Sequence, residues 1–301
     1  MVQEYWRWPE SSWTATNIDW KKSKTITAGV DIGTNSSQAV VMCDDRLFSY
    51  ASLRTGADYR ASAGVAMEQA LGSSGMKLKN IRYIVGTGWG SQNVSFARKT
   101  VDEINCHARG ARFMYGPAMK TVVDLGAQTC KAIRLYNWDR IRDFVMNDKC
   151  AAGMGRSIEV MADLLQVPIQ EMGERSLAVE KDPEPVSTTC YAFANTEAIG
   201  LFREGYKESE VLAAYLFAIA WRIHGMVGRV QPEKELAFTG GLAKNSGIVN
   251  RLERAMGMTA LTSEYDPQLA GAIGAAIIAK EITEKADGLK TVSFIGGMPH
   301  P

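Results

Sequence analysis

VDIGTNSSQ, residues 30–38, is the most informative stretch of the chain, because its plan returns in VDLGAQTCK, residues 123–131. In both copies an aspartate ends an apolar run, a glycine follows two residues later, and small polar residues come next. Each copy opens a series of β-rich runs that leads into a helical pattern. Such a duplication predicts an α/β protein of two similar domains, with a ligand in the cleft between them.

The runs around the first stretch predict strands joined by tight turns, with Asp44-Asp45 as one turn signal. They are KTITAGVDIG (24–33), SQAVVMCD (37–44) and RLFSYASLRT (46–55). ASAGVAMEQALGSSG (61–75) then carries apolar residues at helical spacing. IRYIVGTGWGS (81–91) predicts a buried strand that runs into a glycine turn.

The second stretch has the same order. MKTVVDLGAQTCKAIRLYN (119–137) predicts strand, turn and strand, IRDFVMND (141–148) predicts a third strand, and a helix follows from about Cys150. LAGAIGAAIIAKEI (269–282) is a helix of small residues, suited to close packing. We therefore expect a first domain over residues 25–118 and a second over 119–301, whose C-terminal helix is able to pack back on the first.

Residues 1–24 form a separate, tryptophan-rich arm in this scheme. The arm holds four of the seven tryptophans of the chain, which are Trp6, Trp8, Trp13 and Trp20. Tryptophan is enriched among the residues that anchor protein interfaces. The sequence leaves open whether the arm docks on a partner or is a partly ordered tail.

Composition excludes several classes of function. The 301 residues carry a net charge of +1, so no strong field favours nucleic acid or an anionic membrane. No apolar run approaches the roughly 20 residues of a membrane helix, and the N-terminus has no apolar signal segment. Five cysteines at irregular spacing, without a CxxC pair, fit a reducing cytoplasm and no zinc ribbon. We expect a cytoplasmic protein.

The two duplicated stretches have the composition of phosphate-binding loops. Glycine lets backbone N–H groups approach phosphate oxygens, and a carboxylate holds hydrated Mg²⁺. Asp31, Asp124 and Gln128 are the candidate catalytic residues, and the two aspartates are also candidates for Mg²⁺ binding through water. The remaining candidate nucleotide contacts in these loops are Gly33, Thr34, Asn35, Ser36, Gly126, Ala127 and Lys131, with Ser37 as a further hydroxyl donor.

A third stretch, ELAFTGGLAKNSGIVNRLERAM (235–256), predicts a strand that ends at a double glycine and a helix that begins near Asn245. Gly240 and Gly241 allow an adenosine to lie against the backbone, and Asn245 completes this candidate contact set. GTGWGS (86–91) lacks the spacing of a dinucleotide fingerprint and is discounted. Taken alone, each of the three stretches is also an ordinary strand-to-turn segment.

Two cysteines share one context, since Cys150 in NDKCAAGMGR and Cys190 in STTCYAFANTE each stand at or just before a predicted helix start. Free N–H groups and the helix dipole favour a thiolate there. A [4Fe–4S] cluster needs four thiolates, so two from this chain would be joined by two from a partner. Buried or helix-capping cysteines remain the alternative. Cys43, Cys106 and Cys130 are expected to be structural, and Cys106-His107 lacks a third partner for metal chemistry.

Six stretches together resemble the ATPase activators of 2-hydroxyacyl-CoA dehydratases and the ATPase subunits of benzoyl-CoA reductase. They are VDIGTNSS, EINCHARGA, VVDLGAQTCKAI, NDKCAAGMGRSIEV, TTCYAFANTEAI and FTGGLAKNSGIV. The resemblance runs from about Thr27 to Lys280 and implies a duplicated actin-like, sugar-kinase-like (ribonuclease H-like) two-domain ATPase fold. It also implies ATP/ADP and Mg²⁺ as ligands.

The resemblance further implies a dimer with a homologous ATPase subunit that shares one [4Fe–4S] cluster, to which Cys150 and Cys190 correspond by motif position. Ferredoxin would supply electrons, and CoA-thioester-binding subunits would receive them. The family pattern DIGGQDSK departs here to Asp124-Leu125-Gly126-Ala127-Gln128-Thr129-Cys130-Lys131, and the first loop ends in Gln38 where lysine is common. These departures and the arm favour a benzoyl-CoA reductase subunit.

Three alternatives stay open, which are a homodimeric dehydratase activator, a small-molecule (sugar-type) kinase of the same fold, and a non-catalytic sensor or scaffold with a vestigial ATP site. Glu103 and Glu197 are candidates for positioning water or capping a helix.

Overall fold

In the computed structural model, residues 4–136, 140–147 and 154–288 are described. They fall into two compact units, named here after the central strand of each sheet. The β2 unit takes in Glu10–Met119, Leu135–Ile141 and Thr262–Pro301, and the β7 unit takes in Met1–Pro9, Lys120–Arg134 and Arg142–Leu261. Each unit is therefore assembled from three separate segments, whereas the predicted domains were continuous stretches.

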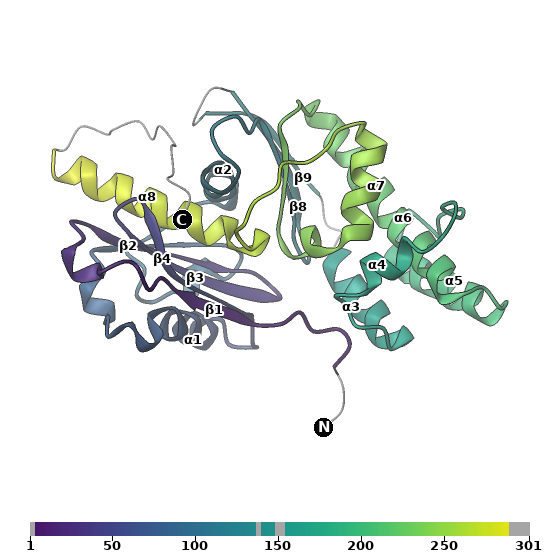
Figure 1. Ribbon diagram of the computed structural model, residues 1–301, viewed down its shortest axis with the longest axis horizontal. Helices are drawn as coiled ribbons and strands as arrows, with labels where there is room; N and C mark the ends of the chain where they lie inside the picture. Colours follow the sequence, from purple (N-terminus) through teal and green to yellow (C-terminus); the bar gives the residue numbers. More distant parts are fainter. Residues whose placement is uncertain (1–3, 137–139, 148–153, 289–301) are drawn as a thin grey trace. The chain divides into compact units, whose positions relative to one another are not determined.

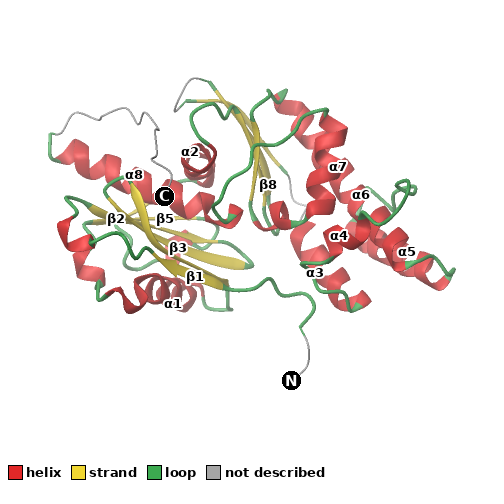
Figure 2. Ribbon diagram, viewed as in Figure 1, coloured by secondary structure: helices red, strands yellow, loops and turns green. Residues whose placement is uncertain are grey.

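The β2 unit is built on a six-stranded sheet in the order β1-β4-β3-β2-β5-β6 (Figures 1 and 2). The strands are β1 (Ser11–Thr14), β2 (Ile26–Ile32), β3 (Ser36–Cys43), β4 (Arg46–Arg54), β5 (Tyr83–Thr87) and β6 (Lys99–Thr100). β2, β3 and β4 form an antiparallel meander, whereas β5 runs parallel to β2. β1, from the predicted N-terminal arm, pairs antiparallel with β4.

Helices cover both faces of this sheet, with α1 on the side opposite α8 (Figure 1). They are α1 (Tyr59–Leu71), α2 (Glu103–Tyr115) and α8 (Ala270–Ala286). One core cluster joins the sheet to α1, and another joins it to α2 and α8. The small-residue helix of the sequence is thus α8, which packs against β2 and β5.

Glycines allow α2 and α8 to touch through their backbones. A Cβ on Gly110 would lie 1.8 Å from the carbonyl oxygen of Ala270, and a Cβ on Gly274 would lie 1.8 Å from that of Cys106. Real Cβ atoms do not occupy such positions, so any larger residue separates the two helices. This close packing determines which α2 side chains reach the end of β2.

The β7 unit has a four-stranded sheet in the order β10-β7-β8-β9. Its strands are β7 (Thr121–Leu125), β8 (Cys130–Leu135), β9 (Ile141–Met146) and β10 (Leu236–Thr239). Its helices are α3 (Met154–Leu165), α4 (Met172–Ser176), α5 (Tyr191–Arg203), α6 (Glu208–Val227) and α7 (Ser246–Met256). One apolar core cluster joins the sheet to these helices.

Short 3-10 turns complete the described chain. They are Trp20–Lys22, Gly72–Ser74, Leu78–Asn80, Ser91–Asn93, Gly228–Val230, Gly241–Lys244 and Pro267–Leu269.

The predicted duplication is confirmed by strand order and register. β4-β3-β2-β5 in one sheet corresponds to β9-β8-β7-β10 in the other. Asp31 pairs with Gln38 on the antiparallel side and with Thr87 on the parallel side. Asp124 pairs in the same way with Lys131 and Thr239. Both units are thus the same α/β design, with an aspartate at the same place in each.

Among the described residues, one helical segment, Glu208–Val230, is long and apolar enough to cross a membrane. This corrects the expectation that no run of the chain approaches that length. The segment is α6 and the turn after it, and 61% of its most apolar window is buried inside the protein. Tyr215 and Ile219 of α6 belong to the core of the β7 unit. A core helix passes the same test, so the finding is weak evidence for a membrane span.

The α2–α8 contact gives a stability prediction. Gly274→Ala forces a methyl group toward the Cys106 carbonyl and is expected to lower the free energy of unfolding by about 2 kcal/mol, as over-packing does. Gly64→Ala in α1 is the control, because no atom lies within 4 Å of its Cβ position. That change should raise stability by about 0.5 kcal/mol. Urea unfolding followed by circular dichroism measures both, and equal effects would contradict the packing account.

Candidate functional site

Asp31 is the last residue but one of β2, and its carboxylate lies against the backbone of two glycines. The residue is 7% exposed. A Cβ on Gly88 would lie 2.2 Å from its Oδ1, and a Cβ on Gly271 would lie 1.9 Å from its Oδ2. Gly88 has φ +84°, in the left-handed region that glycine adopts without strain. The fold therefore uses two glycines to fix one carboxylate at the end of the central strand.

Asp124 ends β7 in the corresponding place, and it is 2% exposed. Its Oδ2 lies 2.9 Å from Lys131 Nζ, and its Oδ1 accepts a hydrogen bond of 3.1 Å from Thr239 Oγ1. Gly240, again with φ +84°, would place a Cβ 2.9 Å from Oδ1. A buried carboxylate is stable when a cation and hydrogen bonds compensate its lost hydration, and this one has both.

The turns that follow the two aspartates share a backbone conformation. Gly33 N donates to Ser36 O at 2.9 Å, and Gly126 N donates to Thr129 O at 3.0 Å. Both turns follow an aspartate at a strand end and face a Thr-Gly pair on the neighbouring parallel strand. Each unit therefore offers a carboxylate beside a tight glycine turn, which is the kind of site that suits a phosphate with its metal ion.

The two carboxylates differ in their partners. His107 Nε2, from α2, lies 3.8 Å from Asp31 Oδ2, and both side chains are buried. At the position equivalent to Lys131, Gln38 instead donates to Ser52 Oγ at 3.1 Å. Thr87, the equivalent of Thr239, donates to the carbonyl of Val101. Asp124 is thus paired with a lysine of its own sheet, whereas Asp31 faces a histidine from a helix.

The other predicted residues of the first loop occupy two environments. Gly33, Thr34, Asn35 and Ser36 are half-buried, and Ser36 Oγ accepts from Gln268 Nε2 at 3.3 Å. Ser37, by contrast, is fully buried and shares a 2.7 Å hydrogen bond with Thr55 Oγ1. Its hydroxyl therefore holds β3 to the end of β4, and this corrects the prediction that it is available as a donor.

In the second loop, Gly126 and Ala127 are half-buried and Gln128 is exposed. Lys131 Nζ, a predicted phosphate contact, lies near Asp124 and donates to Thr129 Oγ1 at 3.0 Å. The carbonyl of Ala127 accepts from Gly155 N at 3.0 Å and from Arg156 N at 3.3 Å. The loop is thereby attached to the first turn of α3.

The third predicted element lies as expected at a strand-to-helix turn. β10 ends at Thr239, Gly240 has positive φ, and Asn245 caps α7 by accepting from Ile248 N at 3.0 Å. Gly241 begins the short 3-10 turn between them. Sequence reasoning placed both the double glycine and the helix start correctly.

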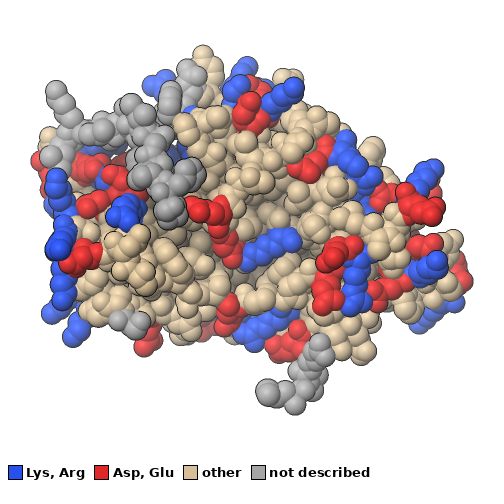
Figure 3. Space-filling model, viewed as in Figure 1, with Lys and Arg blue, Asp and Glu red and all other residues tan. Residues whose placement is uncertain are grey.

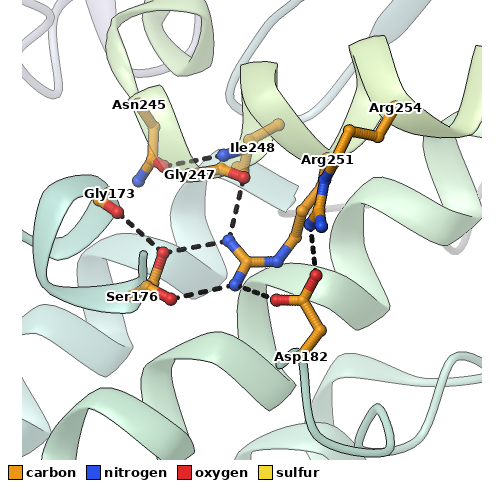
Figure 4. Close-up of polar contacts among 8 residues, drawn as sticks. All are labelled: Gly173, Ser176, Asp182, Asn245, Gly247, Ile248, Arg251 and Arg254. Carbon is orange, nitrogen blue, oxygen red and sulfur yellow. Dashed lines mark hydrogen bonds and ion pairs between the residues drawn. The ribbon is translucent and has the colours of Figure 1, made fainter. Parts of the chain in front are cut away.

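A buried polar network holds this turn against α4 (Figure 4). Arg251 Nη1 donates to Ser176 Oγ at 3.0 Å, and its Nη2 lies 2.5 Å from Asp182 Oδ1. Arg254 bonds the other oxygen of the same carboxylate. The helices meet at glycines, since a Cβ on Gly247 would lie 2.3 Å from Ser176 Oγ.

Asn245 is the one predicted nucleotide contact with an unmet buried donor. The residue is 1% exposed, and its Nδ2 has no hydrogen-bond partner among the described residues. A buried amide without a partner costs free energy unless a ligand or water satisfies it. The missing Cβ of Gly240 accommodates the Leu125 carbonyl, at 2.5 Å from the Cβ position, so the Asn245 amide is the group of this turn that suits a ligand.

Cys190 is the N-cap residue of α5, so the predicted helix start is confirmed there. It is half-exposed, and its turn is held by Arg222 Nη1 donating to Thr189 O at 3.1 Å. Glu197 Oε2, from within α5, accepts from Ser187 N at 2.6 Å, which holds the loop before the helix and does not cap it. Glu103 is the first residue of α2, behind the N-cap Asp102.

Cys150, the other predicted cluster ligand, lies outside the described residues. The described chain resumes at Met154, with Gly155 against the Asp124 loop. Before the gap, Asn147 Nδ2 donates to Gln128 O at 3.1 Å, and its Oδ1 accepts from Cys130 N at 2.5 Å. No group of three or more metal-binding side chains occurs among the described residues.

Sequence reasoning missed the contact of His107 and the role of Thr87-Gly88. His107 was set aside with Cys106 for want of a partner, and that partner is Asp31, 76 positions earlier in a strand. The glycines of GTGWGS were discounted, although Gly88 lies against the Asp31 carboxylate. The signal available was the repetition of Thr-Gly at the ends of both parallel strands, Thr87-Gly88 and Thr239-Gly240.

Charges on the surface are mixed in sign. On the face drawn in Figure 3, basic and acidic side chains are interspersed over both units, as a net charge of +1 would suggest. That face therefore shows no continuous basic area of the kind that a nucleic-acid backbone requires.

Comparisons with known proteins identify the family of the chain. The profile of the BadF/BadG/BcrA/BcrD ATPase family matches residues 28–279. The activator of lactoyl-CoA dehydratase from Anaerotignum propionicum is 37% identical over 259 residues, which are 86% of this chain and 99% of that relative. A benzoyl-CoA reductase component from Thauera aromatica is 30% identical over 265 residues, 84% of this chain and 92% of that relative.

A solved structure has the same fold. The activator of the 2-hydroxyisocaproyl-CoA dehydratase from Clostridium difficile, with bound ADPNP, matches with a TM-score of 0.81 at 33% identity. The match covers 90% of this chain and 100% of that one. With the duplicated sheets described above, this confirms the predicted actin-like two-domain ATPase fold.

The buried pair in the β7 unit gives a second prediction. Lys131→Met leaves Asp124 buried without its cation and is expected to lower the free energy of unfolding by about 3 kcal/mol or more. Lys120→Met is the control, because Lys120 forms only half-exposed pairs with Glu233 and Glu235. It should change stability by less than about 1 kcal/mol. Chemical unfolding without nucleotide is the measurement, and an unchanged midpoint for Lys131→Met would show that the pair is not structural.

Thiol chemistry gives a third prediction. Burial, with the nearby charges of Asp31, Asp102 and Glu103, raises the pKa of Cys106 to about 12, and burial also raises the pKa values of Cys43 and Cys130. A raised thiol pKa keeps the unreactive neutral form at pH 8.

Iodoacetamide at pH 8 should therefore label Cys190 in folded, iron-free protein and spare those three until denaturant is added. Mass spectrometry of tryptic peptides reads the result. Rapid labelling of Cys106 in folded protein would contradict its burial.

Proposed function

Because the chain belongs to the BadF/BadG/BcrA/BcrD ATPase family, we propose that it is the ATP-hydrolysing activator of a 2-hydroxyacyl-CoA dehydratase. The observation that carries the ATPase part is the pair of equivalent loops, each with a buried aspartate at a strand end beside a glycine of φ +84°. A single loop of this kind is common. Two in the same register on duplicated sheets are the arrangement expected for a nucleotide with its metal ion.

The residues present fit an adenine nucleotide. Backbone N–H groups of the Asp31 and Asp124 loops suit phosphate oxygens, and Asn245 offers its buried Nδ2. The solved activator that shares this fold contains ADPNP, which supports the same ligand here. Thr34, Asn35, Ser36 and Gln128 remain the proposed side-chain contacts to the phosphates.

The different partners of the two aspartates assign them different parts. Asp124 is compensated by Lys131 and Thr239 within its own sheet, so we assign it to holding the second loop in shape. Asp31 has no lysine at the corresponding position, where Gln38 stands, and we assign it to Mg²⁺ through water. We therefore assign the hydrolysis of ATP to residues of the β2 unit.

The cysteines support an iron–sulfur cluster shared with a second subunit. Such a cluster supplies low-potential electron transfer and requires four thiolates, of which this chain would give Cys150 and Cys190. Cys190 fits the role by its place at the N-terminus of a thirteen-residue helix and by its partial exposure. Ferredoxin as donor and a CoA-thioester enzyme as acceptor remain proposals.

The choice of partner enzyme rests on similarity, which favours the dehydratase activators over the benzoyl-CoA reductase preferred from sequence alone. The lactoyl-CoA dehydratase activator is 37% identical and nearly fully covered, against 30% for the reductase component. A sugar-type kinase of the same fold would not require a cysteine such as Cys190 at the start of a helix.

A pair of variants tests this proposal. Cys190→Ser is expected to remove most of the iron from anaerobically purified protein and to leave nucleotide affinity within about twofold, because the thiol lies outside both loops. Asp31→Asn should keep the iron and lower ATP turnover by at least about a hundredfold. Iron assay, EPR and phosphate release are the readouts.

Wild-type protein that is free of iron and phosphorylates a sugar would overturn the activator assignment. Activity assays separate the two candidate partners. Reconstitution with a 2-hydroxyacyl-CoA dehydratase should give ATP-dependent dehydration, whereas reconstitution only with a benzoyl-CoA reductase would return the assignment to the reductase.

A further inference from the structure

The N-terminal residues 4–9, EYWRWP, lie against the β7 unit at α3 and the turn before α4. The carbonyl of Tyr5 accepts from Ile169 N at 2.8 Å, and the carbonyl of Arg7 accepts from Gln170 Nε2 at 3.3 Å. Trp6 and Trp8 are half-buried and pack on the apolar core of the unit. The segment is thus held by both backbone and side chains, as a bound peptide is.

This segment lies outside the region that defines the family, since the family match begins at residue 28. The alignment with the lactoyl-CoA dehydratase activator already uses 99% of that relative and 86% of this chain. Residues 4–9 therefore lie outside the part of the chain that the family model matches.

Arg156 joins the segment to the nucleotide loop. Its guanidinium lies 5.9 Å from the centre of the Trp6 ring, within reach of a cation–π attraction. The same side chain lies 2.6 Å from Glu159 Oε2, one turn further along α3. Its backbone N donates to the carbonyl of Ala127, as that of Gly155 does. One residue therefore contacts the Asp124 loop through its backbone and the N-terminal segment through its side chain.

Space is tight on the loop side of this junction. A Cβ on Gly155 would lie 2.7 Å from the Cα of Ala127. The first turn of α3 therefore has no room to move toward the loop, and Trp6 of the segment contacts the Arg156 side chain of the same turn.

We propose that residues 4–9 are an intramolecular ligand of α3, which docks on Arg156, Ile169 and Gln170 and fixes the first turn of α3 against the Asp124 loop. The occupant of this surface is the chain's own N-terminal segment. Its effect is to pre-organise the loop, so that fewer conformations are lost when a nucleotide binds. This consequence for nucleotide binding rests on the proposed function, whereas the docking itself does not.

The test compares tryptophan substitutions in the full chain. Trp6→Ala with Trp8→Ala removes the side chains that dock on the β7 unit. Trp13→Ala is the matched control, because Trp13 stacks on Tyr50 in the sheet of the β2 unit and is 46% exposed. Hydrogen exchange by NMR or mass spectrometry, without nucleotide, follows the amides of Gly155 and Arg156.

We expect exchange at these amides to rise at least about tenfold in the double variant and to stay unchanged in Trp13→Ala. A synthetic peptide of residues 4–10, added to the double variant, should restore protection at high concentration. Equal exchange in wild type, double variant and control would overturn the proposal. If the double variant does not fold, Trp6→Leu keeps apolar bulk, removes the aromatic face and should still raise exchange at Arg156.

Nucleotide titration forms the second arm. ADP affinity should fall several-fold in the double variant and not in the control, because the loop is less pre-organised. A wild-type chain that binds no nucleotide would sink the proposed function but leave the exchange result standing. Normal ADP affinity together with raised exchange would support the docking of the segment and overturn its effect on nucleotide binding.

Discussion

A buried carboxylate at the end of each central strand, packed against a left-handed glycine, is the constraint on which the rest of the structure depends. A charge in that position needs compensation, and the neighbouring elements are arranged to supply it. In the β7 unit, Lys131 and Thr239 come from the strands on either side of Asp124. In the β2 unit the sheet supplies no lysine, and His107 reaches Asp31 from α2. Gly271 of α8 lies against the same pair, since a Cβ there would lie 1.9 Å from Asp31 Oδ2 and 3.3 Å from His107 Nε2.

The two duplicated sheets thus share their backbone geometry, whereas the side chains around the two aspartates differ. Register, turn conformation and the φ value of +84° agree between Gly88 and Gly240. The side chains at Gln38 and Lys131, which occupy the same position, form different contacts. Under the proposed function, the kept backbone and altered charges correspond to one loop as a fixed support and one carboxylate for the metal ion. This asymmetry is difficult to reconcile with two loops that have the same task.

Much of the fold was predictable, because the signals for it are local. The β-rich runs, the Asp-x-Gly turns and the start of α7 each depend on a few neighbouring residues, and the structure has them. The contacts of His107 were not predictable in this way, since they arise from helices 160 or more positions apart meeting at Gly110 and Gly274. The sequence identifies Lys131 as a cation, but the orientation of its side chain toward Asp124 depends on the register of β7 and β8.

The prediction for Ser37 was wrong because the side chain is buried in the folded sheet, where it bonds Thr55. The length of α6 escaped notice because Arg222 and His224 interrupt an otherwise apolar helix.

The placement of α8 also bears on how the chain is made. A Cβ on Gly29 of β2 would lie 2.0 Å from the carbonyl of Ala272, so the central strand of the β2 unit has α8 as an immediate neighbour. Residues 270–286 are among the last of the described chain to leave the ribosome, although β2 is among the first. Domains generally fold as units as they emerge, so the β7 unit, begun later, is able to finish first. During synthesis the sheet that carries Asp31 has one face uncovered until the end, and a chaperone or a slow folding step is expected to act there and not at the β7 unit.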